Sequence, residues 1–315
     1  MKPPKVLLFF VDGFGLPAES PFAYTRLLGL EARHLPGEVP YQGIGVAADA
    51  RLGVPGLPQS ATGQTALFTG VNAPAIVGRH VSGLPGPTLR RLIEKKGLFG
   101  RLRKRGLDAS RMCFANAFRP TFFEKDRPRV SVSTYHALAG GVPLRTLQDL
   151  AQGRALYHDF TNSLLIDKGI PLPLFSPEAA GMILARITKS YIFTVYEYFL
   201  TDLVGHGRLN ANPLQVIKNL DAMLCALLEH LSLKEETVVL VSDHGNVEDT
   251  QRPLHTLNPV PVVVWGKGKE KVLSVKTIQD VSYMLEDLIG DYLTAIPTSD
   301  MPASLQNPMT RTTSP

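Results

Sequence analysis

Three apolar stretches of this chain each end in residues of the types that bind divalent metals, and this arrangement constrains the fold more than any other feature of the sequence. The stretches, with the residues that follow them, are Val6–Val11 with Asp12, Tyr191–Phe199 with Asp202, and Thr237–Val241 with Asp243 and His244. Short apolar runs of this kind are typical of buried strands. The carboxyl ends of parallel strands meet at one edge of a sheet. The sequence therefore predicts a parallel sheet with aspartate and histidine gathered along that edge.

Helical patterns lie between the strand-like runs. Pro213–Leu231 repeats leucine and isoleucine at helical spacing, and another strand-like run follows at Pro261–Trp265. Strands that alternate with helices predict an α/β protein with a mostly parallel central sheet flanked by helices. With 315 residues, the chain is long enough for about two domains.

The middle of the chain differs from both flanks. Residues 76–185 are interrupted by glycine and proline, as in Gly83-Leu84-Pro85-Gly86-Pro87, and contain none of the metal-type motifs. We predict that this segment is an inserted α+β cap domain and that residues 1–75 and 186–296 together form a metal-binding core. Residues 297–315 are rich in proline, serine and threonine with little apolar content, which predicts a disordered tail.

Charge and cysteine content narrow the classes of function. The net charge of +5 is mild and the aromatic residues are not interleaved with a dense basic run, so we expect no nucleic-acid binding. The basic stretch at 95–105 is expected to form a solvated helix face. No stretch approaches the roughly 18 apolar residues of a membrane span. Two cysteines, Cys113 and Cys225, suggest no disulfide framework. We expect a soluble, cytoplasmic protein, and the sequence leaves its oligomeric state open.

Aspartate and histidine recur at spacings that bring their side chains together. Asp202 and His206 are four residues apart, so on a helical turn they face the same side. Asp243 and His244 are adjacent, and His255 follows eleven residues later, just before another strand. Mixed carboxylate and imidazole ligands suit divalent metals. Each piece alone is common at protein surfaces, but their recurrence at successive strand ends predicts a metal site.

A serine at the start of a predicted helix is the candidate nucleophile. Ser60 follows a loop rich in glycine and proline and opens a helical stretch that runs to Gly70. Serine is also a favoured N-cap, so Ser60 has a purely structural alternative role. A helix N-terminus presents free N–H groups and a positive dipole end to an anion. A serine placed there beside a metal is suited to accept a phosphoryl group, with Thr62 as the competing hydroxyl.

Taken together, these motifs resemble the alkaline phosphatase superfamily of metalloenzymes, and within it the branch of cofactor-independent phosphoglycerate mutase and phosphopentomutase. The motifs that carry the resemblance are Asp12-Gly13-Phe14-Gly15, Ser60-x-x-Gly63, Asp202-x-Val204-Gly205-His206, Asp243-His244-Gly245-Asn246 with Glu248, and His255-Thr256 before Asn258-Pro259-Val260-Pro261. The resemblance covers roughly residues 5–75 and 190–290 and does not extend to the cap.

The resemblance implies two divalent metal ions, with Mn²⁺ and Zn²⁺ as the leading candidates. The ligands it implies are Asp202, His206 and His255 for one ion, and Asp12, Ser60, Asp243 and His244 for the other. It implies that Ser60 takes a phosphoryl group from a small phosphorylated metabolite. The phosphoserine would then pass the group to water, as in a phosphatase, or to a substrate hydroxyl, as in a phosphomutase.

The chain also departs from the mutases, and the departures concern the substrate. Gln64 stands where the mutases have a histidine, and the cap is shorter than that of the phosphoglycerate enzymes. The candidate substrate contacts, for which a solvated surface position is the alternative, are Arg79, His80, Arg119, Arg127 and Arg129. Tyr196, Glu197 and Tyr198 are expected to serve packing.

Two further readings of the whole chain stay open. One is a phosphodiesterase or sulfatase of the same superfamily, although the residues after Ser60 lack the proline and arginine of a sulfatase motif. The other is a non-catalytic member of the superfamily that binds metal for structure. A non-catalytic member is expected to lack at least one metal ligand or the nucleophile, whereas this chain has a suitable residue at all seven of those positions.

Overall fold

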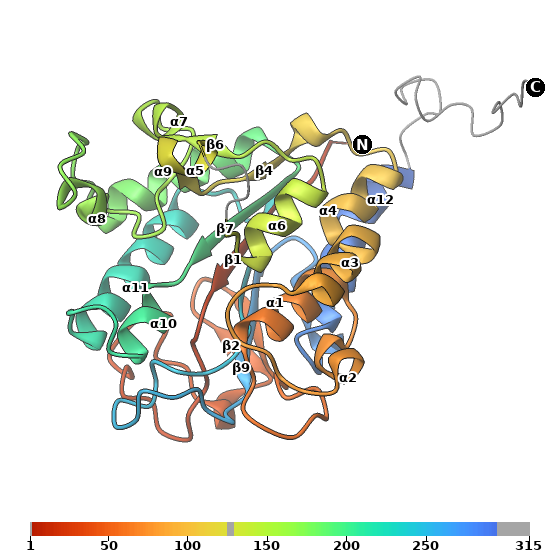
Figure 1. The fold of residues 1–315 in the computed structure, drawn as a ribbon, viewed down its shortest axis with the longest axis vertical. Helices are drawn as coiled ribbons and strands as arrows, with labels where there is room; N and C mark the ends of the chain where they lie inside the picture. The colour runs from red at the N-terminus through yellow and green to blue at the C-terminus, as the bar shows by residue number, and fades with distance from the viewer. Residues whose placement is uncertain (1, 125–128, 295–315) are drawn as a thin grey trace, which may run out of the picture.

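The computed structural model describes residues 2–124 and 129–294, and within them a seven-stranded sheet forms the centre of the molecule (Figure 1). Its strand order is β2-β3-β9-β8-β1-β7-β4. The strands are β1 (Lys5–Val11), β2 (Gly37–Val39), β3 (Gly43–Ala48), β4 (Met112–Phe114), β7 (Phe193–Tyr198), β8 (Glu236–Ser242) and β9 (Val260–Gly266). The four neighbours β8, β1, β7 and β4 run parallel, whereas β9, β3 and β2 pair antiparallel. The predicted α/β fold, with a sheet that is parallel in its core, is confirmed.

The central strand β1 shows why the sheet is covered on both faces. Alternate side chains of a strand point to opposite faces, and Val6, Leu8 and Phe10 join one hydrophobic cluster while Leu7 and Phe9 join another. All five residues are at most 1% exposed. Strands buried on both faces read as continuous apolar runs, which is the pattern of the β1 sequence.

Helices pack against each face of the sheet (Figure 1). On one side lie α1 (Ser60–Thr69), α2 (Ala73–Val77), α3 (Pro87–Lys96), α4 (Leu98–Lys104), α6 (Val132–Ala139) and α12 (Asp280–Thr294). On the other side lie α9 (Pro177–Ser190), α10 (Leu200–Gly205) and α11 (Pro213–Glu229). Short 3₁₀ turns complete these layers at η1 (Ala32–His34), η2 (Ala109–Arg111) and η3 (Lys269–Ser274). None of the helices in the described residues is both long enough and apolar enough to span a membrane.

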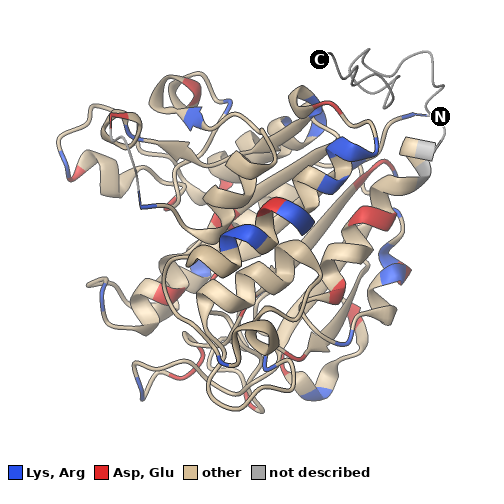
Figure 2. Ribbon diagram, turned by 45° about the vertical axis from the view of Figure 1, so that its right-hand side comes forward, with Lys and Arg blue, Asp and Glu red and all other residues tan. Residues whose placement is uncertain are grey.

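Residues 76–185, which the sequence assigned to an inserted cap, do not all lie outside the core. Strand β4 pairs with β7 in the central sheet. Helices α3 and α4 bury apolar side chains such as Ile93 and Leu102 in the same cluster as β1, while Lys95 and Lys96 stay exposed. Figure 2 shows lysine and arginine along these helices. Most of the basic stretch therefore lies on the outer face of two core helices, whereas Arg101 is largely buried and pairs with Glu286 of α12 at 2.7 Å.

A smaller unit sits beyond the end of β4. It contains β5 (Ala117–Phe118), β6 (Arg145–Thr146), α5 (Pro120–Phe123), α7 (Leu147–Ala151) and α8 (Ser163–Ile166). Strands β5 and β6 pair in a two-stranded sheet, and Leu150, Ala155 and Leu165 form part of a separate small cluster. We propose that the inserted cap is limited to parts of residues 117–175, because α6 within this range packs in the same cluster as β1. The predicted tail, residues 297–315, and the candidate contact Arg127 lie outside the described residues.

Candidate metal centre

Three neighbouring strands deliver the predicted ligands to one edge of the sheet. Val11 of β1 is level with Tyr198 of β7 and Ser242 of β8, so the three strands end together. Asp12 follows β1 directly, and Asp243 follows β8. After β7 the chain turns into α10, which carries the next ligand. The edge expected from the apolar runs is therefore formed by β8, β1 and β7.

The first ligand group consists of Asp202, His206 and His255. The Nε2 atoms of His206 and His255 lie 2.9 Å apart. Asp202 Oδ1 lies 3.3 Å from Nε2 of His206 and 3.4 Å from Nε2 of His255. These three ligand atoms all lie within 4.8 Å of one another. Helix α10 places Asp202 and His206 on one side, as their spacing predicts.

The hydrogen bonds of the two histidines determine which nitrogens face this group. His206 Nδ1 lies 2.9 Å from the carbonyl oxygen of Pro253, and His255 Nδ1 lies 2.7 Å from that of Pro58. A carbonyl oxygen only accepts, so each neutral imidazole carries its proton on Nδ1. Both Nε2 lone pairs then face each other at 2.9 Å, which is repulsive unless a cation lies between them. This orientation of the imidazoles is typical of metal-ligating histidines.

The second group gathers around His244. Its Nε2 lies 2.9 Å from Ser60 Oγ, 3.3 Å from Asp12 Oδ1 and 3.5 Å from Asp243 Oδ2. Among the described residues, Asp12 Oδ1 and Asp243 Oδ2 are buried and accept no hydrogen bond. Buried carboxylate oxygens are normally hydrogen-bonded, so these two are suited to a cation. Asp202 also approaches Asp12 and His244, and it therefore belongs to both groups.

The pKa values of the three carboxyl groups reflect how much negative charge is buried together. Burial, with the charge of Asp243 beside it, raises the pKa of Asp12 to about 7. Burial likewise raises the pKa of Asp243 well above its ordinary value, and Asp202 adds to this effect. At Asp202 burial acts in the same direction, but the imidazoles of His255, His244 and His206 beside it outweigh burial and lower the pKa to about 2. Positive charge at the centre would allow all three to ionise. The donor set thus fits divalent cations.

Glu248 connects the loops that carry the ligands. One of its carboxylate oxygens accepts hydrogen bonds from the backbone N–H groups of Gly15 and Asn246, both at 2.8 Å. The other accepts from Thr256 Oγ1 at 2.5 Å and Asn258 Nδ2 at 3.1 Å. A Cβ atom on Gly15 would lie 2.1 Å from Glu248 Oε1, so only glycine fits there. This explains why Glu248 accompanies the motif after β8.

Two amide side chains orient the ligand carboxylates. Asn246 Nδ2 donates to Asp202 Oδ1 at 3.0 Å. Gln64 Nε2 donates to Asp12 Oδ2 at 3.1 Å. Gln64 stands one helical turn after Ser60 in α1, which brings it to the same cavity. Gln64, the residue that departs from the mutase pattern, therefore donates a hydrogen bond to a metal-ligand candidate.

The structure distinguishes the two candidate hydroxyl groups. Gln59 is the N-cap of α1, and Ser60 is the first residue of the helix with its Oγ beside His244. Thr62 is fully buried, donates to the carbonyl oxygen of Gln59 and accepts from the N–H of Val81. Ser60 lines the cavity in front of the metal centre, and Thr62 does not.

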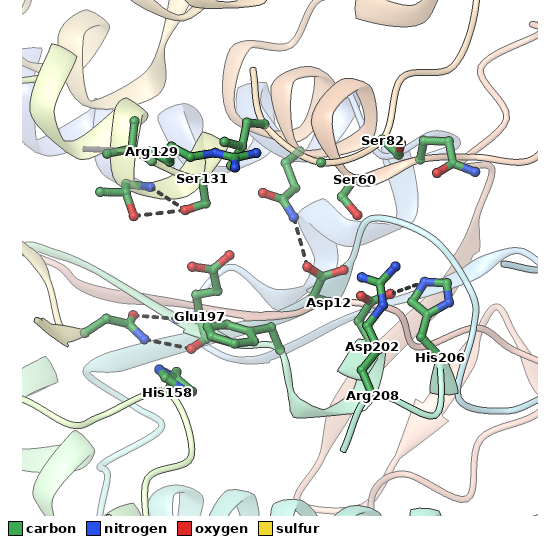
Figure 3. A pocket seen from close by; sticks show the side chains of 18 of the residues that line it. Asp12, Ser60, Ser82, Arg129, Ser131, His158, Glu197, Asp202, His206 and Arg208 are labelled. Carbon is green, nitrogen blue, oxygen red and sulfur yellow. Dashed lines mark hydrogen bonds and ion pairs between the residues drawn. The ribbon is translucent and has the colours of Figure 1, made fainter. Parts of the chain in front are cut away.

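A cavity of about 1000 Å³ opens in front of the metal centre (Figure 3). Arg119 and Arg129, two of the predicted substrate contacts, line it. Arg79 and His80 do not line it. Arg79 is exposed, and His80 Nε2 lies 3.2 Å from the carbonyl oxygen of Val54. Neither of these two predicted contacts therefore faces the cavity.

Two further cavity residues were not identified as site residues from the sequence. The Arg208 guanidinium points into the cavity beside Asp202 (Figure 3). Glu197, which the sequence assigned to packing, lies at the end of β7 and also lines the cavity. It accepts a hydrogen bond of 2.6 Å from Ser133 Oγ, and burial, with the nearby charge of Asp12, raises its pKa to about 8. The sequence offered one signal for each residue. Glu197 is a charged residue within an apolar strand, and Arg208 follows the ligand motif Asp202–His206 closely.

Comparison with known proteins agrees with this geometry. The model of the metalloenzyme superfamily matches residues 177–291. A 2,3-bisphosphoglycerate-independent phosphoglycerate mutase of Paracoccus denitrificans is 31% identical over 122 residues, which cover 36% of this chain and 24% of that protein. The corresponding mutase of Desulforudis audaxviator is 34% identical over 121 residues, which cover 36% and 23%. The match thus spans about a quarter of the length of these relatives.

Two solved structures share the fold over nearly the whole chain. A protein of Pyrococcus horikoshii aligns with a TM-score of 0.51 at 14% identity, over 92% of this chain and 98% of that one. The alkaline phosphatase of the Antarctic bacterium TAB5 aligns with a TM-score of 0.50 at 12% identity, over 92% and 99%. The chain therefore shares its fold with these two structures, and its residues 177–291 are similar to the metalloenzyme superfamily.

Proposed function

We propose that this protein is a two-metal-dependent phosphoryl-transfer enzyme that acts on a small phosphorylated metabolite through a phosphoserine at Ser60. The observation that carries the proposal is the position of Ser60 Oγ, 2.9 Å from Nε2 of His244 at the N-terminus of a ten-residue helix. A hydroxyl that touches a metal ligand and lies at the positive end of a helix is suited to attack phosphorus.

The residues divide into those that hold the cations and those that hold the substrate. Asp202, His206 and His255 would hold one ion, and the carboxylates and imidazole around Ser60 would hold the other, with Mn²⁺ and Zn²⁺ the candidates that suit oxygen and nitrogen donors. Bound cations would neutralise phosphoryl charge and lower the pKa of the serine hydroxyl. Arg208 points into the same part of the cavity, where its guanidinium is placed to donate to phosphoryl oxygens.

The phosphoserine has two chemically reasonable outcomes. Transfer to water would make the protein a phosphatase, and transfer to a second hydroxyl of the substrate would make it a phosphomutase. The matches to the relatives named as phosphoglycerate mutases cover about a quarter of the length of those proteins. We therefore propose the phosphoryl-transfer chemistry without assigning phosphoglycerate as the substrate. We also propose that the partners are small molecules, neither nucleic acid nor membrane, in the cytoplasm.

The first test is hydrolysis by metal-stripped protein to which Mn²⁺ or Zn²⁺ is returned. The substrates are p-nitrophenyl phosphate, bis(p-nitrophenyl) phosphate, p-nitrophenyl sulfate and a panel of sugar and acid phosphates. We expect metal-dependent turnover of monoesters, a loss of at least about 10³-fold in Ser60→Ala, and a phosphorylated Ser60 peptide after acid quench.

Ser82→Ala is the matched control, because Ser82 is a second serine that lines the same cavity and, among the described residues, makes no hydrogen bond to a ligand candidate; it should retain near wild-type activity. Turnover that survives Ser60→Ala, or that favours the diester or the sulfate, would contradict the proposal. Binding of two ions without turnover of any ester, and without phosphorylation of Ser60, would support a non-catalytic member instead.

A further inference from the structure

The cavity extends well beyond the phosphoryl site, and aromatic side chains line its far part. Phe118 ends β5, Phe122 belongs to α5, Tyr157 and His158 lie in the loop after α7, and Phe199 follows β7. We call these five residues the aromatic wall. They come from separate segments of the chain, so the sequence pattern alone does not group them.

Backbone pairing joins these segments into one surface. Asn116 bridges Leu156 in parallel, with a hydrogen bond of 2.8 Å from the N–H of Ala117 to the carbonyl of Leu156. Phe118 and His158 each stand two residues after this bridge, so the pairing brings the segments that carry them side by side. Phe199 continues the surface toward the metal centre, because it precedes Asp202 by three residues.

The rings contact each other in two groups, Phe118 with Phe122 and His158 with both Tyr157 and Phe199. The centroids of Phe118 and Phe122 lie 4.6 Å apart. His158 stacks on Phe199 at 4.3 Å with an interplanar angle of 26°, and Tyr157 contacts His158 at 3.9 Å. Such contacts fix the orientation of the rings before any ligand arrives. The wall is therefore a preformed surface.

The wall is apolar yet incompletely covered. Phe118, Phe122, His158 and Phe199 are all partly exposed, whereas most other phenylalanines among the described residues are buried. Burial, with the charges of Lys168 and Arg119, lowers the pKa of His158 to about 3, so its ring is neutral at physiological pH. Apolar surface gains about 25 cal/mol per Å² when it leaves water. A flat apolar group would gain from covering these rings.

A cation lies at the edge of the wall. Arg119 lines the cavity, and its charge acts on Tyr157 as well as His158. Arginine stacks on rings and donates hydrogen bonds in one plane. Aromatic rings with an arginine at their edge suit a heteroaromatic group that carries hydrogen-bond acceptors. Ligand pockets hold drug-sized molecules at about 300–1000 Å³, so the volume of about 1000 Å³ admits such a group.

We propose that the substrate is a phosphate monoester whose organic part carries a planar aromatic ring, of the size of a nucleoside 5′-monophosphate, and that this ring lies against the aromatic wall. The inference rests on the proposed function for the position of the phosphoryl group at Ser60. Short polar esters such as glycerol phosphate would leave the wall in contact with water.

The test compares the metal-loaded protein on adenosine 5′-monophosphate, phenyl phosphate and glycerol 1-phosphate. We expect kcat/KM to be higher for the two aromatic esters. Phe118→Ala and Phe118→Leu should lower kcat/KM about 10-fold for the two aromatic esters, through a higher KM. Neither variant should change kcat/KM for glycerol 1-phosphate. The leucine variant keeps apolar volume without a ring. Leu174→Ala is the control, since Leu174 is 68% exposed and does not line the cavity.

Equilibrium binding of adenosine, measured by calorimetry, separates this inference from the proposed function. Equal kcat/KM for all three esters, or equal effects of Phe118→Ala on all three, would overturn the inference and leave phosphoryl transfer standing. If no ester is turned over, the proposed function fails, and adenosine binding alone decides the role of the wall. Binding that Phe118→Ala weakens about 10-fold supports it, and absence of adenosine binding refutes it.

Discussion

Replacement of Glu248 tests whether one buried carboxylate holds the ligand-bearing loops together. It accepts four hydrogen bonds, from the backbone N–H groups of Gly15 and Asn246 and from the side chains of Thr256 and Asn258. The residue is 6% exposed, so water replaces these bonds poorly. None of the four partners is itself one of the seven ligand candidates, which makes the effect on folding separable from direct loss of a ligand.

The expected magnitude follows from the donors that lose their acceptor. Glu248→Ala leaves two buried backbone N–H groups unsatisfied, each at about 1–3 kcal/mol, so the free energy of unfolding should fall by about 4 kcal/mol. Glu248→Gln should lower it by only about 1–2 kcal/mol. In that variant the amide oxygen still accepts from Gly15 and Asn246, and the amide NH₂ donates to Thr256 Oγ1 and to a rotated Asn258.

Urea unfolding of the metal-free proteins, followed by circular dichroism, measures these differences. Asp249→Ala is the matched control, because Asp249 is adjacent, only partly buried and accepts a single hydrogen bond from Gln251. It should change the free energy of unfolding by about 1 kcal/mol or less. The reasoning is refuted if Glu248→Ala lies within about 1 kcal/mol of the wild type, or if the glutamine variant is as unstable as the alanine variant.

Three further predictions concern the ligands and the buried acid. His255→Ala should lower the gain in the free energy of unfolding that Mn²⁺ or Zn²⁺ gives the wild type by about 2.7 kcal/mol, the contribution of one ion at about 100 times its dissociation constant; equal gains in thermal melts of both proteins would contradict this. Gln64→Leu removes the donor to Asp12 and should raise the metal dissociation constant about 10-fold in calorimetry, whereas an unchanged constant would show that the amide is dispensable. Burial raises the pKa of Glu197 from 4.5 to about 8, so its contribution favours folding fully below pH 4.5 and is lost as the pH rises through 8. Metal-free wild type should therefore lose stability relative to Glu197→Gln between these pH values, and parallel stability curves would contradict the shift.

The parts of the fold that could be predicted from sequence are those with a strong local pattern. The run at β1 is apolar at every position because helices cover both faces, and the strand end at Asp12 follows from that. The spacing of Asp202 and His206 placed both on one turn of α10, which the structure shows. The antiparallel half of the sheet was not predicted, because β2 and β3 are short and β9 is buried on both faces like a parallel strand.

The boundary of the cap was harder to predict from the sequence, because it depends on which helices pack against the core. Helices α3 and α4 carry many basic residues, and this obscured the apolar stripe of Leu89 and Ile93 that joins the core. Arg208 and Glu197 were missed for a related reason. A single charge on a loop or strand has no pattern of its own, and its approach to the cavity depends on how distant segments pack around it.

The metal-ligand candidates and the aromatic wall occupy different parts of the covalent chain. Six of the seven ligand candidates stand in the segments that follow β1, β7 and β8, and Ser60 opens α1, whereas four of the five wall residues stand on the excursion between β4 and α9. Changes in that excursion can alter which molecule fits without moving a ligand atom. The residues proposed to bind the substrate ring and the residues proposed to carry out phosphoryl transfer are thus largely separate in the chain. Exchange of the segment that carries the wall could therefore change substrate specificity while the phosphoryl-transfer chemistry is kept.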